Sequence, residues 1–168
     1  AALVRPIGGW LSDRRGGAPI TFWSFAVMAV APLVAAAFLP GADGGGSVVG
    51  FVLVFLVLFL AAGIGNGSTF RMIPTIFRTL RDREVTDRND AVALEEARRV
   101  GATEAAATMG FSSAVAAFGG FFIPIAYGTS IHLSGSPQGA LIFFSLFYLS
   151  CLWITWRCYS GKAAETPC

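Results

Sequence analysis

Long stretches without a single charged residue set the pattern of this chain. Four segments of at least 24 residues contain no Asp, Glu, Lys or Arg: residues 18–42, 44–70, 105–131 and 133–156. A helix needs about 20 apolar residues to cross the hydrocarbon core of a bilayer, so each segment is long enough. The pattern predicts four transmembrane helices, over residues 19–40, 48–77, 105–127 and 140–157.

The segments near the N-terminus and between the helices are more polar. Residues 1–11 are expected to form the end of a further helix, followed by a tight turn from Ser12 to Gly17, because paired glycines and a short acid favour turns. The Gly- and Ser-rich segments 41–47 and 128–139 are expected to connect helices. These features indicate an all-α membrane protein.

The segment 78–104 carries most of the charge. It contains six arginines and seven acids and is predicted to be a cytoplasmic loop. Within it, Asp90 is a candidate N-cap, and acids precede arginines at helical spacing. We therefore expect a surface helix that leads into the predicted helix at 105–127.

The distribution of basic residues predicts which segments face the cytoplasm. Arg and Lys occur in the turn at 12–17, in the segment 78–104 and in the tail after Trp156, whereas 41–47 and 128–139 have none. Cytoplasmic loops carry an excess of Arg and Lys, and the alternation across four helices is self-consistent. We expect a multi-pass protein of the inner (plasma) membrane with a cytoplasmic C-terminus.

Composition supports a membrane location. Hydrophobic residues make up 55% of the 168 residues and charged residues 13%, against roughly 25% charged in soluble domains. The net charge of +2 is small and the arginines are scattered, so no nucleic-acid surface is expected. The expected partner is the lipid bilayer.

Few residues could support catalysis or bind a cofactor. His132 is the single histidine, no Cys-x-x-Cys motif occurs, and no Ser, His and acid set is expected to assemble inside the membrane. Neither an enzyme, a metal site nor a cofactor is therefore expected. The three cysteines, an odd number, are expected to be free thiols: Cys151, Cys158 and Cys168.

Arg5 is the candidate for a functional charge. It lies eight residues before Asp13, about 12 Å inside the predicted cytoplasmic edge of a hydrocarbon core whose half-thickness is about 15 Å. A charge near the midplane costs roughly 2.5–3.5 kcal/mol, so an arginine there indicates a functional site, and pairing or snorkelling is the less favoured alternative. Guanidinium is planar and always protonated, which suits a small oxyanion.

Small residues mark two of the predicted helices. In the helix at 105–127, five fall close to one face: Gly110, Ser113, Ala114, Ala117 and Gly120. Helix packing alone is the simpler interpretation, although transporter sites also form where helices approach near the midplane. The same two interpretations apply to Asn66 in the glycine-rich stretch 63–67, which also favours an interruption of its helix.

The stretch Arg5-Pro-x-Gly-Gly-Trp-Leu-Ser-Asp-Arg-x-Gly-Gly17 resembles the loop motif that the major facilitator superfamily repeats in its two halves. The resemblance implies that residues 1–168 are one transmembrane bundle, the C-terminal half of a twelve-helix fold from the end of helix eight through helix twelve. It also implies that Asp13 and Arg14 belong to a cytoplasmic latch whose ion pairs form in one access state. Arg71 would pair in that latch, guide anions or only anchor its helix.

Two further stretches resemble one particular family within this superfamily. Gly63-x-Gly-Asn-Gly-Ser-Thr-Phe-Arg-Met-Ile-Pro74 and the run from Gly110 to Pro124 resemble the C-terminal half of NarK-type nitrate/nitrite porters, whose second nitrate signature matches 110–122. In that family two basic residues, one per half, clamp the anion. The resemblance places the second of them at Arg5 and a backbone contact at Gly110. Two further residues from the small-residue runs complete the candidate substrate-binding set: Ser113 and Asn66.

The leading hypothesis is nitrate/nitrite antiport by alternating access. The first signature and the partner arginine are absent, so the N-terminal half of the same transporter is an expected partner and this fragment is not expected to transport alone. Exchange is favoured over nitrate/proton symport because no predicted span carries an acid. A porter for another small anion and a non-transporting membrane sensor or scaffold are the alternatives.

Overall fold

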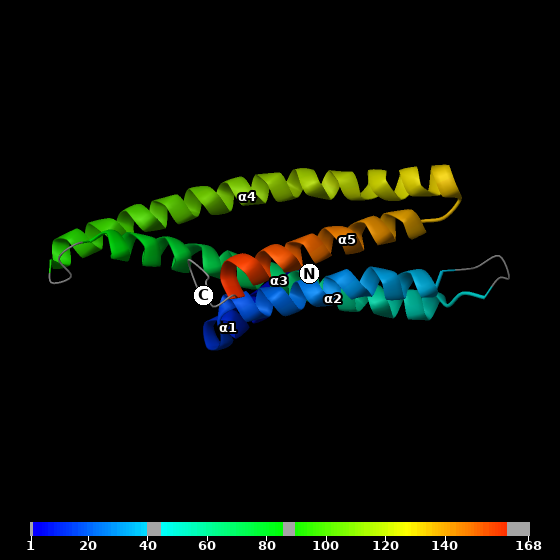
Figure 1. The fold of residues 1–168 in the computed structure, drawn as a ribbon, viewed down its shortest axis with the longest axis horizontal. Coiled ribbons are helices and arrows are strands. Elements are labelled where there is room, and N and C mark those ends of the chain that lie inside the picture. The colour runs from blue at the N-terminus through cyan, green and yellow to red at the C-terminus, as the bar shows by residue number, and fades with distance from the viewer. Residues whose placement is uncertain (1, 40–44, 86–89, 161–168) are drawn as a thin grey trace.

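The computed structural model describes residues 2–39, 45–85 and 90–160, and these are almost entirely helical. The chain forms a short 3₁₀ turn, five α-helices and a π-helical end: η1 (Ala2–Val4), α1 (Arg5–Arg15), α2 (Gly17–Ala37), α3 (Val48–Glu84), α4 (Ala91–Ser134), α5 (Gln138–Thr155) and η2 (Trp156–Ser160). Figure 1 shows them as a bundle elongated along the helix axes. The described residues contain no strand, which confirms the all-α fold.

Four helices in the described ranges are long and apolar enough to cross a membrane. They are α2, α3, α4 and the helix from Gln138 to Tyr159 that combines α5 with most of η2. The predicted number of transmembrane helices is therefore confirmed, and the chain is a multi-pass membrane protein.

The N-terminal turn is shorter than predicted. Residues Ser12 to Arg15, expected to form a polar turn, continue α1, and the chain reverses at Gly16, whose φ of 86° lies in the region that glycine adopts without strain. The glycine-rich stretch 63–67 is also continuous helix, so the expected interruption of α3 is wrong.

The segment 78–104, expected to be a loop with a surface helix, is mostly two long helices. α3 continues through Glu84, and α4 begins at Ala91 with Asp90 as the expected N-cap, its carboxylate accepting hydrogen bonds from the backbone N–H groups of Val92 and Ala93. At a rise of 1.5 Å per residue the 37 residues of α3 span about 55 Å, well beyond a hydrocarbon core of about 30 Å.

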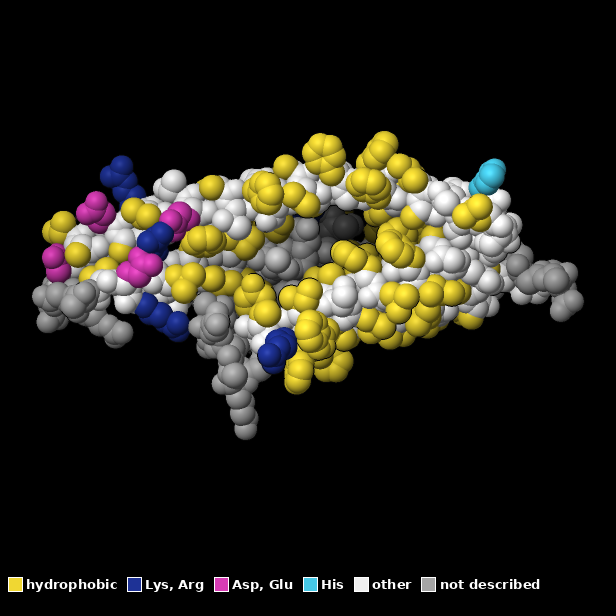
Figure 2. Space-filling view, turned by 45° about the horizontal axis from the view of Figure 1, so that its top comes forward, with side chains coloured by type: hydrophobic (Ala, Val, Ile, Leu, Met, Phe, Trp, Pro, Cys, Tyr) yellow, Lys and Arg dark blue, Asp and Glu magenta, His cyan; other side chains and the backbone are white. Residues whose placement is uncertain are grey.

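A helical hairpin therefore projects past the membrane-spanning part of the bundle. The beginning of α2 at Gly17 lies level with Met72 of α3, because a Cβ at Gly17 would lie 2.9 Å from the Met72 sulfur. Residues 73–84 and 91–105, here named the hairpin extension, continue beyond that level for about 18 Å. Figure 2 shows that charged side chains gather at this end of the molecule, with the histidine at the other end.

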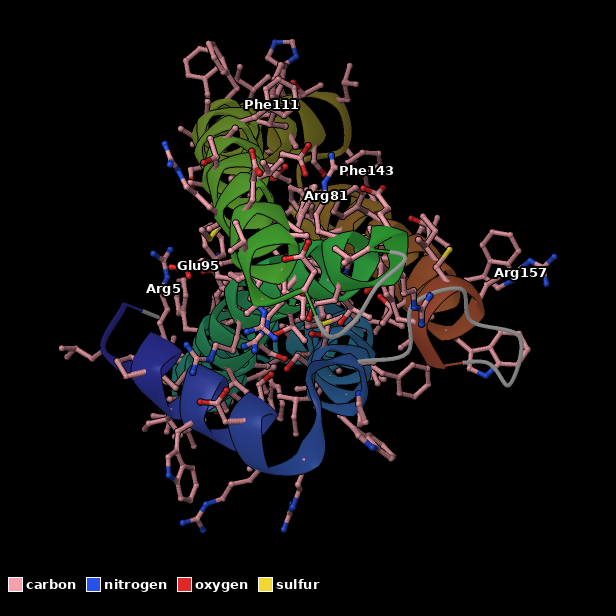
Figure 3. The ribbon with its side chains drawn as sticks, turned by 90° about the vertical axis from the view of Figure 1, so that its left-hand side faces the viewer. Arg5, Arg81, Glu95, Phe111, Phe143 and Arg157 are labelled. Atoms are coloured by element: carbon pink, nitrogen blue, oxygen red, sulfur yellow. The ribbon has the colours of Figure 1, made fainter. Side chains whose placement is uncertain are left out.

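The core lies where α2 packs between α3 and α5, with α1 on the outer side of α3 (Figure 3). Interhelical hydrogen bonds add to this packing. Thr21 Oγ1 donates to Ser68 Oγ over 3.0 Å, and Ser68 Oγ donates to the Gly17 carbonyl over 2.9 Å. Ser145 of α5 donates to the Ala29 carbonyl of α2 over 2.8 Å. All donors are buried, so α1, α2, α3 and α5 form one packed unit.

Most of α4 lies apart from this unit. Among its residues only Gly101 and Ala105 are buried, and its most apolar 18-residue window has no buried residue. A Cβ at Gly110 or Gly120 would meet no neighbouring atom within 4 Å among the described residues. Gly110 and Gly120 therefore make no close helix contact within the described residues. Close glycine contacts occur instead between α1 and α3.

Two of the three cysteines lie within the described residues. Cys151 and Cys158 are free thiols, as expected, and Cys168 lies outside the described residues.

Candidate anion-binding site

A glycine crossing between α1 and α3 positions Arg5. A Cβ at Gly8 would overlap the Ile64 carbonyl oxygen and lie 2.8 Å from the Ile64 Cα, and a Cβ at Gly67 would lie 3.0 Å from the Arg5 carbonyl carbon. Both distances are shorter than an ordinary van der Waals contact of 3.4 Å, so neither position has room for a side chain. The crossing therefore fixes the first turn of α1, from which Arg5 projects, against the middle of α3.

The Arg5 side chain itself is exposed. No ion pair involves it among the described residues. Figure 3 places Arg5 on the opposite side of the bundle from Arg157 of η2. The structure therefore presents a guanidinium group with all its donors available at the start of α1.

Asn66 lies on α3 beside this crossing. It is half-buried and directly precedes Gly67, and its amide makes no hydrogen bond in the part of the chain that the structure describes. The next polar residues along α3 are engaged, since Ser68 donates to Gly17 and Thr69 donates to the Gly65 carbonyl. Asn66 is thus a free donor and acceptor near the position of the Arg5 backbone.

Gly110 and Ser113 lie on α4 and are exposed. Ser113 Oγ donates to the Met109 carbonyl over 2.7 Å, one turn back on its own helix, and Gly110 is open on its outer face. Within the described residues α1 and α4 do not contact each other, and each packs against α3. The chain by itself therefore places Arg5 and Gly110 on two helices that flank α3, without joining them into a closed pocket.

The candidate latch residues are partly brought together. Arg71 Nε donates to Asp13 Oδ1 over 2.6 Å, so an ion pair connects α3 to the end of α1 at the same level as Gly17. Both side chains remain about half exposed. Arg14 does not join this pair, because its guanidinium stacks over the Trp10 ring at 4.1 Å from the centroid.

Ion pairs that were not predicted from the sequence join the two helices of the hairpin extension. Arg81 binds both carboxylate oxygens of Glu104, with 2.9 Å between Nε and Oε2, and also contacts Glu84. Beside it, a Cβ at Gly101 would lie 3.3 Å from the Phe77 carbonyl oxygen, so the two helices touch closely here. The charges were visible in the sequence, but their pairing depends on the alignment of two helices along each other, which no local spacing reveals.

No metal site is found in the described ranges, where no three His, Cys, Asp or Glu side chains cluster. The geometry instead combines, on the short helix α1 and the long apolar helix α3, an exposed ion pair with a guanidinium and an amide that have no partner in the described ranges. The class of protein that these features define is an α-helical multi-pass membrane protein with polar groups available on its membrane-spanning helices.

Comparison with known proteins narrows this class. The chain is 48% identical to the nitrate/nitrite transporter NarU of Salmonella typhimurium and 43% identical to NarU of Escherichia coli, in each case over 96% of its own length. It is 26% identical over 99% of its length to a Thermus thermophilus protein named as a probable nitrate/nitrite antiporter, NarK2. These similarities confirm the resemblance to NarK-type nitrate/nitrite porters.

The chain corresponds to only part of each NarU relative, and this limits what the similarity shows about its function. The chain spans 34% of the length of the two NarU relatives. No family model matches the sequence. The relatives are named as transporters rather than as enzymes, and what they transport is a property of proteins about three times as long as this chain.

Proposed function

We propose that this chain supplies one half of the anion site of a nitrate/nitrite porter in the inner (plasma) membrane, with a cytoplasmic C-terminus. The observation that carries the proposal is the exposed Arg5 guanidinium, which forms no ion pair with any described residue and which α1 presents from a glycine crossing with α3. Within a membrane, an arginine that is not neutralised by an acid favours binding of an anion, because the anion then provides the missing neutralisation. The names of the NarU relatives support nitrate and nitrite as that anion.

The donor chemistry suits a small planar oxyanion. The guanidinium group offers two parallel N–H donors that match two oxygens of nitrate or nitrite. Asn66 adds an amide donor from α3. On α4, Gly110 leaves the backbone uncovered, and the Ser113 hydroxyl would donate to the anion in place of the Met109 carbonyl. The resemblance to NarK-type porters implies that the second basic residue comes from the N-terminal half, so that the anion is held at the interface of the two halves.

The ion pair between Asp13 and Arg71 is proposed as part of the gate. It is exposed to water at the α1–α3 end, where a movement of either helix separates the two side chains without burying a charge. Ion pairs of this kind are weak singly, so they form and break at little cost as access alternates. Arg14, expected in the same latch, contacts Trp10 instead and is not proposed as a member.

Exchange of nitrate for nitrite is proposed in preference to proton symport. All described acids lie on α1, on the hairpin extension or at its ends, outside the most apolar stretches of the helices. These stretches therefore offer no carboxylate to carry a proton across the membrane in this part of the transporter. The proposal includes no enzymatic step and no cofactor.

The test is uptake by the full-length transporter in vesicles. Nitrate uptake is measured into vesicles loaded with nitrite or left empty, for the wild type, for Arg5→Lys, and for Arg99→Lys on the hairpin extension as a matched control. Uptake that requires internal nitrite, falls at least tenfold in Arg5→Lys and persists in Arg99→Lys is the expected result, because lysine cannot form the two-point contact.

The other results separate the remaining hypotheses. Uptake into empty vesicles that is driven by a proton gradient would agree with the proposed anion site but would contradict nitrate/nitrite exchange. Uptake of another anion with nitrate excluded would indicate a porter of different specificity. If the full-length protein transports neither nitrate nor another anion, a membrane sensor or scaffold becomes the favoured hypothesis. Its activity should then be the same in Arg5→Lys as in the wild type.

A further inference from the structure

The α4 helix carries two of the candidate anion-binding residues, Gly110 and Ser113, but little of it is buried within the described ranges. Its buried residues there are Gly101 and Ala105, and both belong to the hairpin extension. Figure 1 shows α4 side by side with the end of α3 at this place and diverging from α3 toward its other end. The hairpin extension therefore holds the buried contact that fixes α4 against α3.

A two-point ion pair lies within this contact. The Nε of Arg81 on α3 donates to Oε2 of Glu104 on α4 over 2.9 Å, and a terminal nitrogen donates to the second carboxylate oxygen. The other terminal nitrogen donates to Glu84 over 2.5 Å, so every nitrogen of the guanidinium is engaged. Two parallel hydrogen bonds define the orientation of a carboxylate as well as its distance. The side chains of Arg81 and Glu104 are only 31% and 34% exposed, so salt screens this pair less than a fully exposed one.

Close backbone packing accompanies the ion pair. A Cβ at Gly101 would lie 3.3 Å from the Phe77 carbonyl oxygen and 3.3 Å from the Cγ of Arg81. Glu104 and Ala105 follow Gly101 by three and four residues, so all three share the face of α4 that is turned toward α3. The contact therefore fixes the rotation of α4 about its own axis as well as its distance from α3.

Gly110 lies close enough to this contact to be positioned by it. It comes six residues after Glu104 in a continuous helix, which is about 9 Å along the axis. At the other end of α4, Ser130 accepts a hydrogen bond from the Ala140 N–H of α5, about 30 Å beyond Gly110. Because Cα atoms lie about 2.3 Å from the helix axis, a rotation of α4 by about 20° moves the Gly110 Cα by about 0.8 Å. A shift of this size takes an ordinary hydrogen bond of about 2.9 Å beyond the normal range.

We propose that Arg81 and Glu104 are positioning residues for anion binding. Their two-point contact fixes the rotation and the height of α4 against α3, and so sets where Gly110 and Ser113 meet the anion. The inference rests on the proposed anion site. Contacts between the two halves of a transporter change as access alternates, so a constant position of α4 relative to α3 depends on contacts within one half. Neither Arg81 nor Glu104 binds the anion itself, since each is engaged by the other.

The experiment measures nitrate binding by the full-length protein in detergent. Isothermal titration calorimetry gives both the dissociation constant and the number of nitrate ions bound per protein. The variants are Arg81→Gln, Glu104→Gln and the exchanged pair, Arg81→Glu with Glu104→Arg. The matched control is Arg99→Gln, because Arg99 is exposed on the hairpin extension and forms no ion pair with any described residue. Arg5→Lys tests the anion site itself.

Both single Gln variants should bind nitrate more weakly. Loss of one hydrogen bond to the anion corresponds to a roughly tenfold rise in the dissociation constant, with the number of bound ions unchanged. The two substitutions change the net charge in opposite directions, so an effect of charge alone would shift the dissociation constant in opposite directions. The exchanged pair should recover most of the affinity, because an arginine on α4 then faces two acids on α3. Arg99→Gln should bind nitrate as the wild type does.

Three results would overturn the inference and leave the anion site in place, provided that Arg5→Lys still binds weakly. They are wild-type affinity in both Gln variants, opposite shifts in the two, and fewer bound ions at an unchanged dissociation constant, which indicates a role in folding alone. A wild type that binds no nitrate would overturn both the inference and the proposed anion site. If one Gln variant fails to fold, the other Gln variant and the exchanged pair decide.

Discussion

The crossing of α1 and α3 provides a sharp test, because two adjacent glycines of α1 differ in their surroundings. A Cβ at Gly8 would overlap the Ile64 carbonyl oxygen and lie 2.8 Å from the Ile64 Cα. The nearest atom to a Cβ at Gly9 is the Gly67 carbonyl oxygen at 3.9 Å, an ordinary contact. Gly8→Ala and Gly9→Ala therefore make the same chemical change at neighbouring helical positions, with and without a clash.

The magnitude follows from these distances. Alanine gains about 0.5–1 kcal/mol over glycine inside a helix, and both variants receive this gain. At Gly8 the Ile64 Cα must also recede by about 0.6 Å to reach an ordinary contact, and the carbonyl oxygen by more, which overpacking data put at about 1–3 kcal/mol. Gly8→Ala should therefore be less stable than Gly9→Ala by about 1–3 kcal/mol.

The same displacement reaches the candidate anion site. Gly8 lies three residues after Arg5, so separation of α1 from α3 moves the guanidinium relative to Asn66. Loss of one charge-assisted hydrogen bond corresponds to about 1.5–3 kcal/mol, so nitrate affinity should fall roughly tenfold or more in Gly8→Ala. Gly9→Ala should keep the affinity of the wild type.

The assays are thermal unfolding in detergent and nitrate binding by the full-length protein. The expected order of unfolding temperatures places Gly9→Ala at or above the wild type and Gly8→Ala below it. If Gly8→Ala unfolds at the same temperature as Gly9→Ala and binds nitrate equally well, the helices do not cross as closely as described. If Gly8→Ala is stable but binds nitrate poorly, the crossing does position Arg5, and the free-energy cost of the clash at Gly8 is smaller than estimated.

Three further variants probe other contacts. Ser68→Ala removes the acceptor of the Thr21 hydroxyl inside the α2–α3 contact and should lower stability by about 1 kcal/mol in thermal unfolding, and an unchanged protein would show that the hydroxyls pair otherwise. Gly135→Ala forces a side chain onto a residue with a φ of 70° at the end of α4, and should cost about 1 kcal/mol in the same assay, with no loss expected if the turn relaxes freely. Arg81→Glu should separate the helices of the hairpin extension, measured as faster amide exchange there, and adding Glu104→Arg should restore protection if the two side chains pair directly.

Several features of the chain were fixed by local sequence alone. The charge-free segments were long enough for four transmembrane helices, and hydrophobicity along the chain does not depend on how the helices pack. Asp90 was recognisable as an N-cap because its hydrogen bonds reach only two and three residues along the chain. The loop motif and the nitrate signature indicated the family whose members the comparisons found.

The tertiary structure decided what depends on the alignment of separate helices. Glycines that looked like a flexible interruption in α3 proved to be continuous helix, because Gly67 lies against α1 and Gly65 against Ser24 of α2. A Cβ at Gly110 or Gly120 of α4, whose spacing also suits helix packing, would meet no atom within 4 Å among the described residues. Spacing within one helix defines a face, but which face is covered depends on contacts between residues far apart in the chain.

The ion pairs show the same difference between what the sequence and what the tertiary structure determine. The sequence placed arginines and acids in 78–104 but did not reveal that Arg81 pairs with Glu104, 23 residues away on the opposite helix. It likewise suggested Asp13, Arg14 and Arg71 for one latch, whereas the structure pairs Asp13 with Arg71 and stacks Arg14 on Trp10. The sequence by itself determined which groups are charged and how deep they lie along the helices, because both are properties of one segment. Only the tertiary structure decided their partners, because an ion pair forms within about 4 Å, a distance set by helix packing.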